Sequence, residues 1–290
     1  MDRATIPPVS SQDAPAGPRP WLLLLPAGVF LGFLVIASLL ILRLSFGVKG
    51  AEWATWSLDS YRAIFSSLYL RSILLTFRLS IVSAAVTVIL ALPVAMFMAR
   101  VTQAHIRRLL LLVLLLPLLM NLVLQSYGWL VLLAPDGLLN RGLRTLGLTE
   151  RPILFLFNES GVMLGMVQTA FPLAVLPIAN AFKTIPSSLE EAAALLGANR
   201  LRVIWHIMLP LAAQGIIAAS LLVFAFNVSA FVVPFLLGGR RVSMLALLIR
   251  DQMGPLLNWP LGAANSVVLV VLALLVLTAY QTLARRRQVR

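Results

Sequence analysis

The sequence predicts an all-α, polytopic membrane protein with six transmembrane helices, and two observations support this prediction. Of the 290 residues, 60% are hydrophobic and only 11% are charged, and the mean hydropathy is +0.97. This apolar share is well above that of a typical globular domain. The apolar residues also fall in long runs, and about 20 such residues in a helix cross the hydrocarbon core of a bilayer.

The charge and the rare residue types exclude several classes of protein. The net charge is +13, but the arginines lie between apolar runs, where positive residues anchor helices at the lipid surface. We therefore expect contact with membrane lipid and none with nucleic acid. The absence of cysteine excludes disulfides and thiolate nucleophiles. The two histidines, His105 and His206, are far apart in the sequence, so no metal site is expected.

The chain divides into three parts. Residues 1–20 hold five prolines among small polar residues and predict a disordered N-terminal tail. Residues 21–284 form the transmembrane domain, and residues 285–290 form a basic C-terminal tail. The six spans are expected at 21–46, 72–99, 108–134, 161–182, 207–236 and 262–284. The first span is too long for a signal peptide and no cleavage site follows it, so we expect it to stay attached.

Two connectors between the spans have features of their own. Residues 52–70 interleave aromatic and polar side chains, which is typical of a segment at the lipid–water boundary. In residues 136–148, leucines recur at helical spacing and predict a short surface helix. We expect both connectors to anchor the protein rather than to contact a solute.

The positive charges favour one orientation in the membrane. An even number of spans puts both termini on one side. That side carries 12 Lys and Arg residues against 11 on the other, of the 23 in the chain. Clusters in short loops carry the most weight, and they occur in the link at 99–108 and at the C-terminal end. Both termini are therefore expected in the cytoplasm.

The link between the fourth and fifth spans, residues 183–206, contains an acidic stretch in this apolar chain. It reads "SSLEEAAALLGA" from Ser187 onwards. Pro186 should end the preceding helix. Ser187 and Ser188 each precede a glutamate by three residues, which is the spacing of a capping box. The stretch therefore predicts a separate, short, capped helix.

This short helix is expected to have one narrow apolar face. The residues of that face are Leu189, Ala192, Ala193 and Leu196. Gly197 supplies a left-handed stop, and a second helical stretch from Asn199 leads directly into the fifth span. Helices that lie on lipid usually have basic polar faces, whereas this one presents Glu190 and Glu191. Docking in a groove of a cytoplasmic partner is therefore favoured over lying on lipid.

The same link resembles the EAA signature of ATP-binding-cassette importer permeases. The pattern E-A-A-x₃-G-x₉-I-x-L-P is matched from Glu191 to Pro210 at every specified position. The layout of six spans, with the signature between the fourth and fifth, resembles the type I importer permease fold over most of residues 21–284. The resemblance implies a permease subunit in the bacterial inner membrane, driven by a separate ATPase subunit.

The resemblance also implies site residues and partners. The residues expected to dock on the ATPase are Glu190, Glu191, Ala192, Ala193, Leu196 and Gly197. Glu191 would pair with basic groups of the ATPase, Gly197 would make the bend, and Glu190 could serve capping alone. ATP would be bound by the partner subunit, so this chain needs no cofactor. A second permease subunit, usually a different chain, and a periplasmic solute-binding protein would complete the importer.

Three segments resemble the spermidine/putrescine-type branch of these permeases. They lie at 126–143, 231–239 and 259–269. Permeases for iron, phosphonates, opines and thiosulfate share parts of them, so another solute, including an anion, stays open. Polyamine-type permeases also commonly carry an acid just before the F-V-x-P segment, where this chain has Asn227 to Ala230.

No Asp or Glu lies in the core of any predicted span, so the candidate solute pathway consists of polar and aromatic residues. Such groups can replace the water around a cation, although amides and hydroxyls also simply join membrane helices. The candidates are Gln125, Tyr127, Trp129, Gln168, Phe226, Asn227, Ser229 and Phe231. Arg78 would favour an anion if it were buried, but it can also snorkel to the outer surface.

Two other classes of membrane protein fit less well. An intramembrane enzyme needs paired acids, a Ser/His dyad or metal ligands that face a cavity. Glu190 and Glu191 are adjacent and point about 100° apart on a helix, so they cannot form such a pair. A stand-alone secondary transporter commonly has an ionisable group near mid-bilayer, which the spans lack. No phosphate-binding GxxxxGK[ST] motif is present either, so ATP hydrolysis must occur in another chain.

Overall fold

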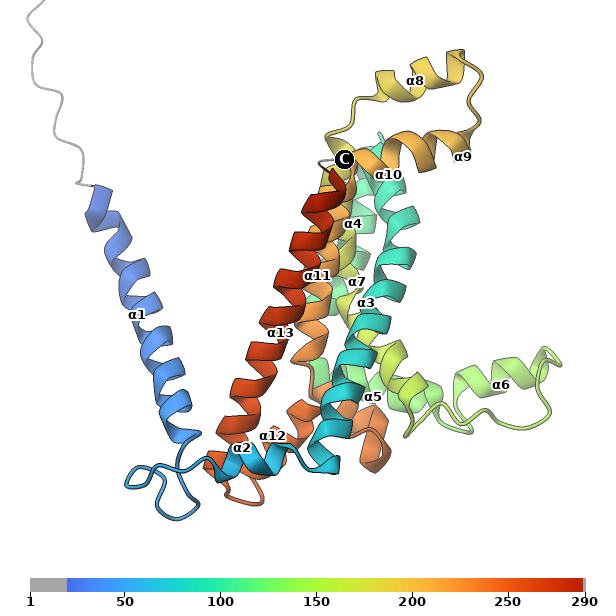
Figure 1. Ribbon diagram of the computed structural model, residues 1–290. Coiled ribbons are helices and arrows are strands. Elements are labelled where there is room, and N and C mark those ends of the chain that lie inside the picture. Colours follow the sequence, from blue (N-terminus) through green and yellow to red (C-terminus); the bar gives the residue numbers. More distant parts are fainter. Residues whose placement is uncertain (1–19, 289–290) are drawn as a thin grey trace, which may run out of the picture.

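The computed structural model describes residues 20–288, and the side chains of residues 25–282, as a bundle of helices with surface segments at both ends (Figure 1). No strand occurs among the described residues, which confirms the predicted all-α class. The tail predicted over residues 1–20 lies outside the described part, apart from Pro20, where the first helix begins. The last helix includes residues 285–288, so most of the predicted C-terminal tail continues that helix.

The helices follow one another along the described chain. Their bounds are α1 (Pro20–Leu44), α2 (Asp59–Ile64), α3 (Ser67–Arg100), α4 (Ala104–Leu119), α5 (Leu122–Leu133), α6 (Leu138–Thr145), α7 (Glu159–Lys183), α8 (Ser187–Leu195), α9 (Arg200–Val203), a π-helical turn η1 (Ile204–Met208), α10 (Leu209–Leu211), α11 (Ala213–Val228), a π-helical turn η2 (Pro234–Gly238), a 3₁₀ turn η3 (Gly239–Arg241), α12 (Leu245–Met253) and α13 (Trp259–Gln288).

Five helical segments are long and apolar enough to cross a bilayer, and a bent pair of helices makes a sixth. The five are Leu25–Leu44, Ser67–Arg100, Leu122–Thr145, Glu159–Lys183 and Trp259–Thr282. The sixth consists of Arg200–Leu211 and Ala213–Val228, which meet at 70°. With this bent pair counted as one span, the number of spans agrees with the predicted six.

The third span is not the single helix predicted over 108–134. α4 ends and α5 begins on either side of a break at Met120 and Asn121. The Asn121 side chain caps α5 by accepting a hydrogen bond of 2.8 Å from the Val123 N–H. Pro117, just before the break, removes one hydrogen bond of α4. The prediction was wrong because the long apolar run indicated one continuous helix and Asn121 was not recognised as an N-cap residue.

The fifth span is also not the single helix predicted over 207–236. The chain leaves α9 through the turn η1 and the short α10, and it then bends by 70° near Ala212 into α11. Pro210 lies just before the bend and has no N–H to donate, which explains the local loss of α-helical bonding. α11 ends at Val228. The second half of the link therefore leads into the span through a sharp bend and not directly.

α3, α7 and α11 pack along one another and form the core of the bundle. One face of α7 is completely buried, and its residues include Ala170, Ala174, Ile178 and Phe182. Small residues on such a face let helix backbones approach closely inside a membrane. α13 lies beside α11, whereas α1 stands apart from the bundle along most of its length (Figure 1). The apolar side chains of α1 are therefore left for lipid or another subunit to cover.

Residues 187–203 form an arm, called here the α8–α9 arm, that projects beyond the bundle (Figure 1). It lies at the end where α1 begins and α13 ends, called here the arm end. The predicted placement of both termini and the acidic link on one side of the bundle is therefore confirmed for the ends of the described chain. α2 and α12 lie at the opposite end (Figure 1).

The short helix predicted over 136–148 is present as α6. Asn140 fixes it to the neighbouring loops although its side chain is fully buried. Its Nδ2 donates to the carbonyl oxygens of Ala134 at 3.0 Å and Ile153 at 3.1 Å, and its Oδ1 accepts from the Ile153 N–H at 2.8 Å. One asparagine therefore bonds to three backbone groups on both sides of α6 and is itself fully paired.

The contact between α7 and α11 depends on Gly215. A Cβ at this position would lie 2.3 Å from the Ala181 Cβ and 3.1 Å from the Pro177 carbonyl oxygen. We expect Gly215→Ala to destabilise the protein by about 1–3 kcal/mol, because α11 must move away from α7. In the matched variant Gly128→Ala, the new methyl group meets nothing within 4 Å, so this change should be neutral or slightly stabilising. Thermal unfolding in detergent measures both, and equal Tm values would contradict the packing.

Candidate functional site

The α8–α9 arm turns at Gly197. This residue has φ +82°, and a Cβ added to it would meet nothing within 4 Å. Glycine is therefore needed for the backbone conformation and not for space. The Gly197 N–H donates to the Ala194 carbonyl and the Ala198 N–H to the Ala193 carbonyl, both at 3.0 Å. This is the Schellman pattern of a helix end, and the predicted left-handed stop is confirmed.

The start of α8 differs from the prediction. Pro186 occupies the N-cap position with extended backbone, and no side chain caps the helix. Ser187 and Ser188 are instead the first residues inside α8. The predicted capping box is therefore wrong, because the helix begins directly after the proline and Glu190 is not used for capping. At the second helix, the Asn199 side chain accepts from the Arg202 N–H at 2.8 Å, so helical structure begins there as expected.

The apolar face predicted for α8 is divided. Ala193 is 8% exposed and faces the rest of the molecule, whereas Leu196 is 89% exposed. Leu189 and Ala192 are also exposed, as is Glu191. Leu195, which was not predicted to belong to the face, is 89% exposed as well. The outer surface of α8 therefore combines the Glu191 carboxylate with exposed leucine side chains. Exposing these leucines to water is unfavourable unless another molecule covers them.

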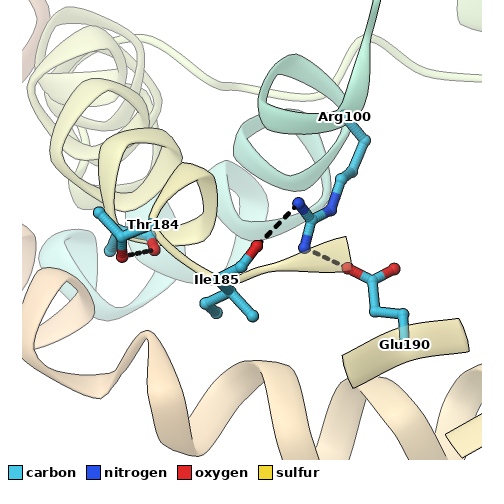
Figure 2. Close-up of polar contacts among 5 residues, drawn as sticks. Arg100, Thr184, Ile185 and Glu190 are labelled. Atoms are coloured by element: carbon cyan, nitrogen blue, oxygen red, sulfur yellow. Dashed lines mark hydrogen bonds and ion pairs between the residues drawn. The ribbon is translucent and has the colours of Figure 1, made fainter. Parts of the chain in front are cut away.

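Arg100, the last residue of α3, contacts both sides of the connection between α7 and α8 (Figure 2). Its Nη1 donates to the Ile185 carbonyl oxygen at 3.1 Å, and its Nη2 forms an ion pair with Glu190 Oε1. The side chains of the pair are 30% and 31% exposed. The sequence alone did not predict Arg100, because a basic residue at the end of a span is expected of any membrane anchor.

Three of the candidate pathway residues form one hydrogen-bonded cluster between α5 and α7. Gln125 Nε2 donates to Gln168 Oε1 at 2.8 Å, and Trp129 Nε1 donates to the same oxygen at 3.1 Å. Gln125 Oε1 is buried and has no partner among the described residues. Tyr127 does not join the cluster, since it is 54% exposed. The cluster thus contains one unpaired carbonyl oxygen, that of Gln125, and the indole group of Trp129.

The other four candidates border a cavity of about 170 Å³, and they are Phe226, Asn227, Ser229 and Phe231. Asn227 is fully buried, and its Nδ2 donates to Ser83 Oγ of α3 at 2.8 Å. Its Oδ1 has no partner within the described structure. Thr169 of α7 also borders the cavity. The sequence did not single out Ser83 or Thr169, because single hydroxyls in apolar helices commonly serve packing.

Arg78 forms an ion pair with Glu159, the first residue of α7. The two side chains are 59% and 48% exposed, so Arg78 is not buried, and its guanidinium group already has a carboxylate partner. This exposure agrees with the expectation that Arg78 reaches the surface. Among the described residues, no group of three or more His, Cys, Asp or Glu could hold a metal ion.

Comparison with known proteins identifies the family. Residues 87–289, which include the whole α8–α9 arm, match the family described as binding-protein-dependent transport system inner membrane component. The spermidine/putrescine transport system permease protein PotB of Escherichia coli (strain K12) is 31% identical over 256 residues, which cover 87% of this chain and 93% of PotB. PotB of Haemophilus influenzae is 32% identical over 251 residues, which cover 86% of this chain and 87% of that protein.

A solved structure supports the fold. A crystal structure of a bacterial ABC transporter involved in the import of the acidic polysaccharide alginate contains a chain with a TM-score of 0.76 to this one. The match covers 92% of this chain and 94% of the other at 19% identity, which is evidence for the fold alone. The expected importer permease fold is confirmed. The chain belongs to the family of inner membrane components of binding-protein-dependent transport systems, and it is a multi-pass permease subunit of an ATP-binding-cassette importer and not an enzyme.

Proposed function

We propose that this permease helps to form the path of a polyamine, such as spermidine or putrescine, across the inner membrane, and that its α8–α9 arm docks on the ATPase subunit. The solute is inferred from the PotB permeases, which are 31% identical over 87% of this chain. The docking role rests on one structural observation: α8 projects from the bundle with its leucines and Glu191 exposed.

The arm is built to transmit force. α8 follows α7 after Pro186, and α9 leads through η1 and α10 into α11. A push on α8 therefore reaches two helices of the bundle core at once. In the proposed complex Glu191 pairs with basic groups of the ATPase, while Leu195 and Leu196 fill an apolar cleft. Burying two leucine side chains contributes about 3–6 kcal/mol before the costs of association.

The arm end then faces the cytoplasm, because the ATPase subunit works there. α1 begins and α13 ends at this same end (Figure 1), which agrees with the orientation inferred from the clusters of Lys and Arg. The opposite end, with α2 and α12, faces the periplasmic solute-binding protein. Lipid or the second permease subunit covers the apolar surface of α1. We expect that second subunit to be a different chain.

A polycation on this path meets aromatic faces and amide oxygens. Within the described long helices α1, α3, α4, α5, α7, α11 and α13, Glu159 at the very start of α7 is the only Asp or Glu. Asp136 lies in the turn between α5 and α6. The unpaired oxygens of Gln125 and Asn227 can each accept a hydrogen bond from an ammonium group, and Trp129 supplies a cation–π surface. The carboxylates that a polyamine needs would come from the second permease subunit or the binding protein. Since Arg78 is paired with Glu159, it no longer favours an anionic solute.

The first test concerns docking. Gly197→Arg should abolish co-purification of the ATPase subunit with a tagged permease, because a side chain at φ +82° distorts the turn that presents α8. The matched control is Gly147→Arg, at the far end of the bundle. Gly147 also has a positive φ, +68°, and open space around its Cα. If both variants retain the ATPase, or if both lose it, the arm is not the specific docking element.

The second test concerns the solute. Proteoliposomes that contain the purified complex and its binding protein should accumulate labelled spermidine only with ATP. Gln168→Leu should lower the rate roughly tenfold, because two buried donors, on Gln125 and Trp129, lose their common acceptor. Gln214→Leu, an exposed glutamine of α11, is the control. ATP-dependent uptake of an anion in place of spermidine would contradict the proposed solute.

A further inference from the structure

Arg100 connects the arm to a helix that the chain itself does not join to it. The covalent connections of α8 lead to α7 on one side and, through α9, to α11 on the other. α3 ends at Arg100, 83 residues before the link begins at residue 183, and the Arg100 side chain contacts the connection to α8 and α8 itself (Figure 2). Arg100 therefore joins α3 to α8.

The two contacts of Arg100 lie on opposite sides of Pro186. Ile185 lies two residues after the last residue of α7, and Glu190 lies in the first turn of α8. One guanidinium group, which is planar and rigid, thus fixes the last carbonyl before the proline and the carboxylate four residues after it. If α8 pivots at Pro186, it must break one of these bonds or move α3 with it.

α3 is well placed to receive such a movement. It packs along α7 and α11 over its length, and its residues Thr76 and Ser83 bond to other segments of the core. Ser83 holds Asn227 at the edge of the cavity. A displacement of the arm end of α3 is therefore passed into the part of the bundle that contains the candidate path.

We propose that Arg100 and Glu190 are positioning residues that make the arm move with α3 when the ATPase subunit pulls on α8. This inference rests on the proposed docking of α8. Ordinary stabilisation explains the pair less well. The side chains of the pair are only 30% and 31% exposed, so the cost of removing both charges from water offsets part of their attraction. Arg100 Nε is also buried with no partner among the described residues, which is itself a cost.

The test compares uptake with ATP hydrolysis. Arg100→Met keeps most of the side-chain length and removes both contacts, and Glu190→Gln removes the charge of the partner. Each should lower the amount of labelled spermidine taken up per ATP hydrolysed by about fivefold or more, with the ATPase still co-purifying. The double variant should be no worse than either single variant, because both changes remove the same link. Arg100→Lys, which cannot bridge two acceptors in a fork, should fall between Arg100→Met and the original protein.

Arg107→Met is the matched control, since Arg107 is exposed on α4 and makes no ion pair in the described part of the chain. It should leave uptake per ATP unchanged. The inference is overturned if Arg100→Met and Glu190→Gln keep full uptake per ATP, if their effects simply add, or if they act only by lowering Tm or ATPase assembly. If the unaltered complex fails to bind an ATPase or to take up spermidine, the proposed function fails instead, before any variant is compared.

Discussion

The close packing of α7 against α3 and α11 sets the position of the two helices that carry the α8–α9 arm. Inside a bilayer, helices gain no hydrophobic attraction for each other, so close packing and hydrogen bonds must hold them together. Here Gly215 lets α11 approach Ala181, and Asn227 bonds to Ser83 of α3. The two helices to which the α8–α9 arm is connected, α7 and α11, belong to this core. If the contact between those two helices shifts, the orientation of the arm therefore shifts with it.

Local chemistry determines where α8 begins and ends, but not where it points. Pro186 sets its start and Gly197 sets its end, each through its own backbone restrictions. Its direction depends on contacts between distant parts of the chain, chiefly that of Arg100 with Ile185 and Glu190. A helix that transmits force needs both fixed ends and a fixed direction. If its ends were flexible, or if it could rotate freely at Pro186, the movement would not reach the bundle.

The sequence predicted what depends on nearest neighbours and composition. Long apolar runs gave the spans, and the left-handed turn at Gly197 followed from one glycine after an apolar repeat. The prediction from hydropathy failed where one residue interrupts an apolar run. The hydropathy pattern predicts one continuous helix across Asn121 and another across Pro210, but the structure has a helix break at Asn121 and a bend after Pro210. The prediction also could not find the pair of Arg100 and Glu190, which are 90 residues apart. Neither residue is unusual until the fold brings the two together.

The polar groups of the spans follow one physical rule. A buried amide that is fully paired joins helices, whereas one with a free oxygen retains affinity for a donor from elsewhere. Asn140 is fully paired and fastens α6. Gln125 and Asn227 each keep an unpaired oxygen, and Asn227 borders a cavity. An unpaired buried acceptor costs free energy. This cost is best explained if water and a passing solute donate in turn to the unpaired oxygen. The distribution of unpaired acceptors, more than the distribution of polar residues, therefore distinguishes a path from a helix contact in this bundle.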